Sequence, residues 1–337
     1  MRIPALDRSC EQVAVRPISD AHWCWLASEI TSSDWLITLN PEAKKELSEL
    51  ARHIEQHPIQ QLQRRVTGYA IPALRDLMQQ LKHKLDHGVG FAVLDRISTQ
   101  QYPQETLVEI YWILGQLIGR PVAQKWNGEM IYDVRDTGVQ FQYGVRGSRT
   151  SVELLFHTDN AFGHMVPDYV GLFCKNPAKE GGISRFCSLY TLHHRLQRSH
   201  PDVLRQLYQP MLYDRQKEHH SDAPPICLAP FFSWRGDRLT ARANTSLVRK
   251  GHEVAGQIMS PELKNALDVV DKVCADDDMW FEAPLEAGQI QYLNNHEIGH
   301  YRSAFTDHEE PEKKRHLFRL WHREAGTNCY DGVQLPV

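Results

Sequence analysis

The sequence has no long apolar run and no strong excess of charge of either sign. Its 337 residues include 38 Lys and Arg against 42 Asp and Glu, which gives a formal net charge of −4. No stretch approaches the roughly 18 apolar residues of a membrane-spanning helix, and no basic stripe indicates a nucleic-acid partner. Residues 1–8 lack the apolar core of a signal peptide. We therefore expect a cytoplasmic protein whose partner is a small molecule, not a membrane or a nucleic acid.

The cysteines also form no pattern that would indicate a structural cross-link. The seven cysteines are odd in number, scattered, and never arranged as Cys-x-x-Cys. This usage excludes a disulfide framework and a cysteine-based zinc site as the main source of stability. We expect buried reduced thiols.

His157-Thr158-Asp159 is the most informative motif that is present. It directly follows the apolar, strand-forming residues 154–156. Because side chains alternate along a strand, His157 and Asp159 lie on one face and Thr158 on the other. Two histidines and one carboxylate on one face of an iron ion leave three adjacent positions open. The motif therefore supplies two of three metal ligands, and the third must come from elsewhere.

The same spacing recurs without that context, because the chain has 18 histidines. Other His-x-Asp or His-x-Glu pairs begin at His53, His200, His220, His308 and His322. Among the pairs that end in aspartate, only His157 follows an apolar strand-like segment. We therefore place the candidate metal site there.

The chain order of helical and strand-like segments predicts a β-rich fold with added helices. Residues 41–85 place leucines at helical spacing, residues 88–94 read as a buried strand, and residues 105–118 read as a second helical region. Helical interruptions are expected at 189–208 and 261–274. Short strands dominate from residue 129 onward, at 130–134, 151–156, 169–175, 182–187, 228–234, 280–282, 289–293 and 316–321.

Many short strands with inserted helices predict a double-stranded β-helix, or jelly roll, with a metal at one open end. We expect one domain over residues 1–337. It comprises an N-terminal helical cover (1–85), a jelly-roll core with helical insertions (86–325) and a C-terminal tail (326–337).

The stretch from residue 289 to His300, followed by Arg315 and Arg319, is where a family resemblance becomes specific. Together with His157 and Asp159, it resembles the taurine dioxygenase and clavaminate synthase group of Fe(II)/2-oxoglutarate-dependent oxygenases. In that group the His-x-Asp/Glu pair is followed far downstream by Asp-Asn-x-x-x-x-His and then by Arg-x-x-x-Arg. The resemblance extends over residues 151–321 and is closest to the clavaminate synthase and asparagine/arginine hydroxylase branch.

The resemblance implies that His300, 143 residues after His157, is the distal iron ligand. Asn295 then occupies the asparagine position of the motif. The sequence departs from the pattern at Asn294, where aspartate is usual, at His296, where arginine is usual, and at Asp159, where this branch usually has glutamate. His296 remains a competing ligand.

The arginine pair indicates a second anion site beside the metal. If residues 316–321 form a strand, Arg315 and Arg319 share one face, which can line the barrel interior. A buried guanidinium needs an anionic partner. The resemblance implies that Arg315 binds the distal carboxylate of 2-oxoglutarate, that Arg319 lies near the co-substrate or a substrate anion, and that Ser184 donates a hydroxyl. The alternative is a pair of surface arginines and a solvated serine.

Substrate contacts are harder to assign. Candidates lie in the loop-like stretch 137–150 before the metal strand, namely Gln140, Gln142, Arg146 and Arg149. Glu153, His164 and Arg319 are further candidates, and a solvated loop or a structural role is the alternative. The branch resemblance implies an amino acid, an amino-acid derivative, or a cyclic or peptide-like intermediate of specialised metabolism.

The resemblance implies Fe(II) as cofactor and 2-oxoglutarate and O2 as co-substrates, with release of succinate and CO2 and, most simply, hydroxylation of a substrate C–H bond. Two other hypotheses remain open on the residues alone. A zinc-dependent hydrolase could use two histidines and an aspartate around a metal-bound water. A non-catalytic jelly-roll protein could retain the metal for stability. The oligomeric state is open.

Overall fold

The computed structural model describes residues 11–18, 21–140, 144–219 and 221–332. Its centre consists of two sheets, as the jelly-roll prediction required. The larger, seven-stranded sheet has the order β1-β2-β14-β6-β17-β3, with β4 paired to β17; the smaller, four-stranded sheet has the order β13-β8-β15-β5. Within these sheets the strand pairs are antiparallel, except for the parallel pair β1 and β2.

The strands of the larger sheet are short, apart from the two long central ones, β6 and β17. Their bounds are Leu36–Thr38 (β1), Phe91–Asp95 (β2), Arg120–Val122 (β3), Tyr132–Val134 (β4), Tyr169–Asn176 (β6), Ile290–Asn294 (β14) and His316–Arg323 (β17). The smaller sheet comprises Leu154–His157 (β5), Ser184–Ser188 (β8), Trp280–Glu282 (β13) and Ile298–Arg302 (β15). A further pair joins Glu180–Gly181 (β7), which precedes β8 in the chain, to Phe305–Thr306 (β16), which follows β15.

Apolar side chains from both sheets form the core between them. Phe91 of β2 and Phe186 of β8 stack with ring centroids 4.3 Å apart. Both rings are fully buried, as are Leu293 of β14 and Cys187 of β8. Burying a side chain of this size stabilises the fold by roughly 1.5–3 kcal/mol relative to leaving it exposed. The packing fixes the distance between the two sheets, and with it the metal-binding strands.

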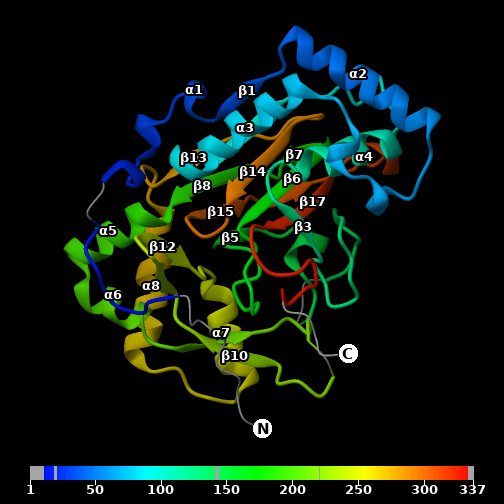
Figure 1. The fold of residues 1–337 in the computed structure, drawn as a ribbon. Helices are drawn as coiled ribbons and strands as arrows, with labels where there is room; N and C mark the ends of the chain where they lie inside the picture. The colour runs from blue at the N-terminus through cyan, green and yellow to red at the C-terminus, as the bar shows by residue number, and fades with distance from the viewer. Residues whose placement is uncertain (1–10, 19–20, 141–143, 220, 333–337) are drawn as a thin grey trace.

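Three helices cover the outer face of the larger sheet, as Figure 1 shows along its upper edge. They are α2 (Pro41–Gln56), α3 (Pro72–His87) and α4 (Gln104–Gly115). Asn40 caps α2 by accepting a hydrogen bond from the Ala43 N–H at 2.8 Å. Helix α3 buries an apolar stripe at the helical period, formed by Leu74, Leu77, Met78, Leu81 and Leu85. Phe318 and Leu320 of β17 belong to the same apolar cluster, so these two side chains face the helices.

The long connection between β8 and β13 forms a separate layer, in the lower part of Figure 1. Its elements are α5 (Leu189–Ser199), α6 (Pro201–Leu207), β9 (Met211–Asp214), β10 (Ile226–Ala229), β11 (Phe232–Arg235), β12 (Arg238–Ala241), α7 (Thr245–Val254) and α8 (Pro261–Ala275). The single strand expected at 228–234 is two strands, because the chain turns after Ala229 to form separate hairpins with β9 and β12. Helix α7 was not predicted. The short helix α1 (Ser32–Trp35) precedes β1.

Among the described residues, no helix is both long enough and apolar enough to cross a membrane.

Candidate active site

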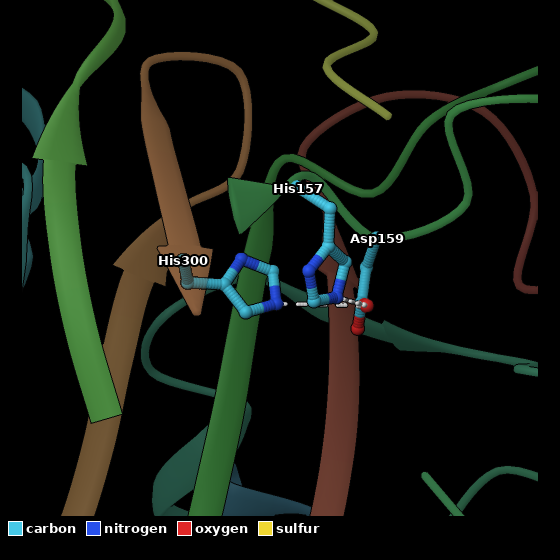
Figure 2. A group of neighbouring side chains, drawn as sticks. All are labelled: His157, Asp159 and His300. Atoms are coloured by element: carbon cyan, nitrogen blue, oxygen red, sulfur yellow. Dashed lines mark ion pairs between the residues drawn. The ribbon is translucent and has the colours of Figure 1, made fainter. Parts of the chain in front are cut away.

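His157, Asp159 and His300 come together at the end of the smaller sheet. His157 is the last residue of β5, and it lies directly opposite His300 of β15 in the antiparallel pairing. The two imidazoles are tilted by 43° with centroids 4.2 Å apart. Both Nε2 atoms lie 3.7 Å from Asp159 Oδ1, and Figure 2 shows the rings directed at this carboxylate.

The three potential ligand atoms lie within 4.8 Å of one another. Nitrogen and oxygen ligands bind a transition metal at roughly 2.0–2.2 Å, so the gap between them has room for an ion. The donor set, two imidazoles and one carboxylate, suits a divalent transition metal such as Fe(II). The structure thus brings the three predicted ligands together with a geometry that fits a metal.

The environment of the histidines favours the form that binds metal. His157 Nδ1 lies 2.7 Å from the Leu155 carbonyl oxygen. Because a carbonyl only accepts, Nδ1 must carry the proton, which leaves the Nε2 lone pair for a metal. Burial, followed by the charge of His157, lowers the pKa of His300 to about 4. His300 is therefore neutral at neutral pH, as a ligand must be.

Asp159 is held by residues of β17. Its Oδ2 accepts hydrogen bonds from Arg319 Nη1 at 2.9 Å and from Trp321 Nε1 at 2.8 Å, which leaves Oδ1 for the histidines. Burial alone would raise the pKa of Asp159, but Arg319 and the histidines outweigh burial and hold that pKa well below its usual value. The carboxylate is therefore charged and oriented before any metal binds.

Asn295 fixes the backbone of Asp159. Its amide oxygen accepts from the Asp159 N–H at 2.8 Å, while its Nδ2 donates to the carbonyl oxygens of Asp159, at 3.0 Å, and Pro167, at 3.1 Å. Asn295 is fully buried. The motif asparagine thus holds in place the backbone of Asp159, the second residue after the end of β5.

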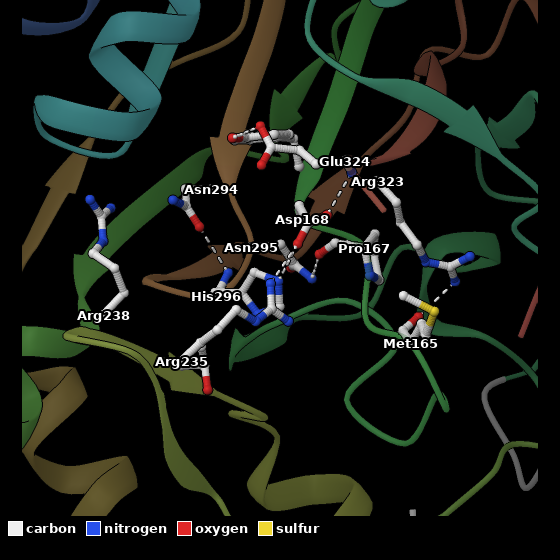
Figure 3. Close-up of polar contacts among 12 residues, drawn as sticks. Met165, Pro167, Asp168, Arg235, Arg238, Asn294, Asn295, His296, Arg323 and Glu324 are labelled. Carbon is white, nitrogen blue, oxygen red and sulfur yellow. Dashed lines mark hydrogen bonds and ion pairs between the residues drawn. The ribbon is translucent and has the colours of Figure 1, made fainter. Parts of the chain in front are cut away.

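His296, the predicted competing ligand, lies outside this group. Figure 3 shows it directed at Asp168, and its Nε2 is 2.8 Å from Asp168 Oδ1. Asp168 Oδ2 accepts from the Glu324 N–H at 2.8 Å, and Arg235 lies 3.3 Å from Oδ1. The group of potential metal ligands found among the described residues contains His300 and not His296.

A second charged group begins at Arg302, two residues after His300 on β15. Arg302 is on the same face of β15 as His300, because the two residues are two positions apart. The guanidinium carbons of Arg302 and Arg315 each lie 5.0 Å from the ring centroid of Phe305. Both arginines are buried. Arg315 was predicted, whereas Arg302 was missed; its position on the His300 face of a strand could have revealed it.

The protein compensates the positive charges of these two arginines poorly. Burial lowers the pKa of Arg315 to about 10, and burial together with the charge of Arg315 lowers the pKa of Arg302 to about 9. Arg302 Nη2 donates to the carbonyl oxygens of Thr150, at 2.9 Å, and Val152. Arg315 Nη1 and Arg302 Nε find no acceptor among the described residues. Two buried cations with unused donors fit an anion.

Gly181, Gly182 and Ser184 lie where the sequence motif predicted, beside these arginines. Both glycines have positive φ, 74° and 66°, which favours residues without a Cβ. A Cβ on Gly182 would come within 3.0 Å of Arg315 Nε. Ser184 is buried and pairs with Arg302 across β8 and β15. The segment can thus approach an anion bound at Arg315.

A cavity of about 580 Å³ is lined by two of the three candidate ligands, His157 and Asp159. Its size suits a small organic ligand. Of the predicted substrate contacts, Arg146, Glu153 and Arg319 line it. Gln140, Arg149 and His164 do not line it, and Gln142 lies outside the described residues. Arg146 Nη2 pairs with Glu218 Oε1 at 2.8 Å, and Glu153 accepts a hydrogen bond from the Tyr301 hydroxyl.

Residues 48–321 match the family described as "Taurine catabolism dioxygenase TauD, TfdA family". The chain belongs to this family. This TauD/TfdA chain is thus an Fe(II)/2-oxoglutarate-dependent oxygenase, and the metal group and the buried arginines lie inside the matched region.

Known relatives agree with the family assignment. FR-33289 synthase of Streptomyces rubellomurinus is 26% identical over 329 residues, covering 93% of this chain and 91% of the relative. Solved structures share the fold at lower identity. Asparagine oxygenase with Fe(II), (2S,3S)-3-hydroxyasparagine and succinate has a TM-score of 0.64 at 18% identity, covering 86% of this chain and 94% of the other. The non-heme iron oxygenase OrfP with Fe, succinate and (3S)-hydroxy-L-Arg has a TM-score of 0.62 at 16% identity, with the same coverage.

Proposed function

We propose that this TauD/TfdA oxygenase hydroxylates a C–H bond of a small amino-acid-like molecule, with His157, Asp159 and His300 as the iron ligands. Arg315, together with Ser184, binds the distal carboxylate of 2-oxoglutarate, and Arg302 adds positive charge beside it. Arg319 lines the cavity and donates a hydrogen bond to Asp159. The product of the co-substrate is succinate, released with CO2.

The observation that carries the proposal is the pairing of a metal group with an adjacent buried cationic site. The three ligand atoms lie within 4.8 Å of one another. Arg302 extends from the same strand face as His300, and Arg315 has an unused donor on Nη1. A keto acid that binds iron at one end and presents a carboxylate at the other would satisfy both sites at once.

Iron and 2-oxoglutarate, when bound, supply the oxidising chemistry. The residues of this chain bind the metal and the co-substrate, orient the substrate and keep water out of the site. Trp321 and Arg319 hold Asp159 Oδ2 so that Oδ1 is presented to the metal. The cavity, which His157 and Asp159 line, would hold one C–H bond of the substrate close to the bound metal, and such a site gains rate from proximity.

An amino-acid-like substrate is supported by the relatives. The asparagine oxygenase and OrfP structures, which share this fold, hold a hydroxylated asparagine and a hydroxylated arginine. Gamma-butyrobetaine dioxygenase of a Pseudomonas species is 26% identical over 254 residues. A zinc-dependent hydrolase would use the same three ligands, but it would have no use for two buried arginines beside the metal. The family match and the arginines together favour the oxygenase.

The proposal is tested by anaerobic titration of the protein with Fe(II) and 2-oxoglutarate, recorded by visible absorption. Wild type should develop the weak charge-transfer band of an iron-chelated keto acid. Arg315→Ala should raise the 2-oxoglutarate concentration needed for half-formation by roughly 10- to 100-fold, because it removes a charge-assisted contact worth about 1.5–3 kcal/mol. Arg96→Ala serves as the control, since Arg96 is an exposed arginine that pairs with Asp95 and Glu286.

Two results would contradict the proposal in different ways. A folded protein that binds iron but forms no band with 2-oxoglutarate would favour a hydrolase or a non-catalytic metal site. A normal band with the same 2-oxoglutarate dependence in Arg315→Ala would keep the oxygenase but move the carboxylate site, and Arg319→Ala would be examined next.

A further inference from the structure

One wall of the active-site cavity comes from the insertion between β8 and β13. Asp214 at the end of β9, Gln216 after it, and Asn244 and Lys250 at α7 all line the cavity that His157 and Asp159 also line. The insertion is thus part of the site and not only a cover. Its polar residues face whatever molecule is oxidised.

Three lysine and arginine side chains and three acidic side chains, Asp214 among them, line this cavity. Its three lysine and arginine side chains are each paired with a carboxylate: Arg146 with Glu218 at 2.8 Å, Lys250 with Glu253 at 2.7 Å and Arg319 with Asp159 at 2.9 Å. No ion pair joins Asp214 to a cation in the described part of the chain. The charges of Lys250 and His219 oppose the effect of burial on the pKa of Asp214 but do not outweigh it. The substrate side of the cavity therefore presents a carboxylate whose charge the protein compensates only in part.

Asp214 is buried and rigidly placed. It is 3% exposed, and helix α7 packs directly on its strand. A Cβ on Gly251 of α7 would lie 2.8 Å from the Asp214 N and 2.5 Å from the Leu212 carbonyl oxygen, so only glycine permits this approach. Burial raises the pKa of Asp214. The fold holds a carboxylate in a place where its charge is unfavourable without a partner.

The hydrogen bond that Asp214 makes within the protein does not require a charge. Its Oδ1 accepts from the Gln216 N–H at 3.0 Å, and an asparagine oxygen could accept the same bond without the cost of burying a charge. The turn that follows is held in a strained form, since Gln216 and Lys217 have φ values of 51° and 60°. It keeps the Gln216 side chain at the cavity beside Asp214.

We propose that Asp214 binds a positively charged nitrogen group of the substrate, an ammonium or a guanidinium, and thereby selects cationic molecules for oxidation. This inference rests on the proposed oxygenase function and specifies its substrate class. The contact lies on the insertion, away from the iron ligands in sequence. It determines which molecule is held, while the metal group determines what is done to it.

The test uses Asp214→Asn, which keeps the acceptor for the turn and removes the charge. The control is Asp237→Asn, a change at an exposed aspartate between β11 and β12. Each full-length protein must first form the Fe(II)–2-oxoglutarate band, which separates this test from that of the proposed function. The band is then titrated anaerobically with L-arginine, L-lysine, L-citrulline, L-norleucine, L-glutamate and Nα-acetyl-L-arginine, and its shift reports binding.

The expected result is that wild type and Asp237→Asn bind cationic members of the panel, and that Asp214→Asn weakens this binding by roughly 10- to 100-fold. Loss of binding on N-acetylation would assign the α-ammonium group to Asp214, whereas loss with citrulline would assign the guanidinium. Three outcomes would overturn the proposal: no cationic member binds to a protein that forms the band, neutral or anionic members bind best, or Asp214→Asn binds cationic members as well as wild type does. If the protein forms no band at all, the proposed function fails instead.

Discussion

Two of the groups that histidine and aspartate form in the described part of the chain differ in what their geometry allows. His157 and His300 both face Asp159 Oδ1 at 3.7 Å, so three potential ligands surround an open space. His296 faces Asp168 Oδ1 at 2.8 Å, which is a direct hydrogen bond with no room for an ion. Residue types alone do not distinguish them, since His296 and His300 are four residues apart in one motif.

The difference follows from where each carboxylate obtains its remaining hydrogen bonds. Asp159 is held on its far oxygen by Arg319 and Trp321, so that its near oxygen stays available. Asp168 is bonded on both oxygens, by His296 and Arg235 on one and by the Glu324 N–H on the other. A metal site keeps one oxygen unused, whereas a structural pair uses both.

Replacing one histidine in each group should show the largest difference between the two groups. His300→Ala should lower Fe(II) affinity by more than about 100-fold, because a direct ligand is lost where loss of an outer partner already costs 10- to 100-fold. His296→Ala should keep iron binding and lose about 1–3 kcal/mol of unfolding free energy, since buried Asp168 loses a partner. Iron content after anaerobic dialysis and urea unfolding of both variants measure the two effects.

The opposite pattern would reverse the assignment. If His296→Ala lost iron while His300→Ala retained it, the competing-ligand hypothesis for His296 would be right and the geometry in Figures 2 and 3 would not describe the metal-bound protein.

The order of elements and the identity of the candidate ligands could be predicted from the sequence because they depend on local patterns. Apolar residues at helical spacing predicted α3, and an apolar run predicted β5 ahead of His157. The alternation of β17 was also predicted: Arg319 faces the site, while Phe318 and Leu320 face the helices. Periods of two and 3.6 residues can be read without knowing the partner of each strand.

Features that depend on distant partners could not be predicted. The strand β15 was missed, because residues 298–302 are not an apolar run and become a strand only through pairing with β5 and β8. Arg302 was missed with it. The pairing of His296 with Asp168 joins residues 128 positions apart, and nothing near either residue indicates the other. Similarly, Asp214 faces the cavity only because α7, an unpredicted helix, packs on β9.

Replacing Trp321 should have a smaller effect, and it tests how Asp159 is oriented within the metal group. Trp321→Phe keeps an aromatic ring but removes the N–H that donates to Asp159 Oδ2 at 2.8 Å. We expect Fe(II) affinity to fall by about 10-fold, the lower end of the effect of outer partners on metal sites, while the fold is retained. Competition with a coloured Fe(II) chelator gives the affinity. Trp25→Phe is a matched control, because it removes a buried indole donor that serves the Val89 carbonyl oxygen instead. Equal affinities in wild type and Trp321→Phe would show that Arg319 alone suffices to orient Asp159.

The smallest expected effect concerns Asp168 and depends on pH. Burial alone would raise the pKa of Asp168, but the hydrogen bond and charge of His296, helped by the Glu324 N–H and Arg235, lower it well below the usual value. A carboxyl group whose folded pKa is depressed stabilises the fold above its unfolded pKa of about 3.9, and this contribution is lost as the pH falls through the range below. Asp168→Asn should therefore lower the free energy of unfolding by about 1–2 kcal/mol at pH 7. The difference from wild type should begin to shrink as the pH falls below about 4, where the unfolded chain binds a proton that the folded protein does not, and it should go on shrinking toward the lower folded pKa. Urea unfolding at several pH values measures the difference. A difference that stays constant with pH would mean that the shape and hydrogen bonds of Asp168, and not its charge, hold His296 away from the metal.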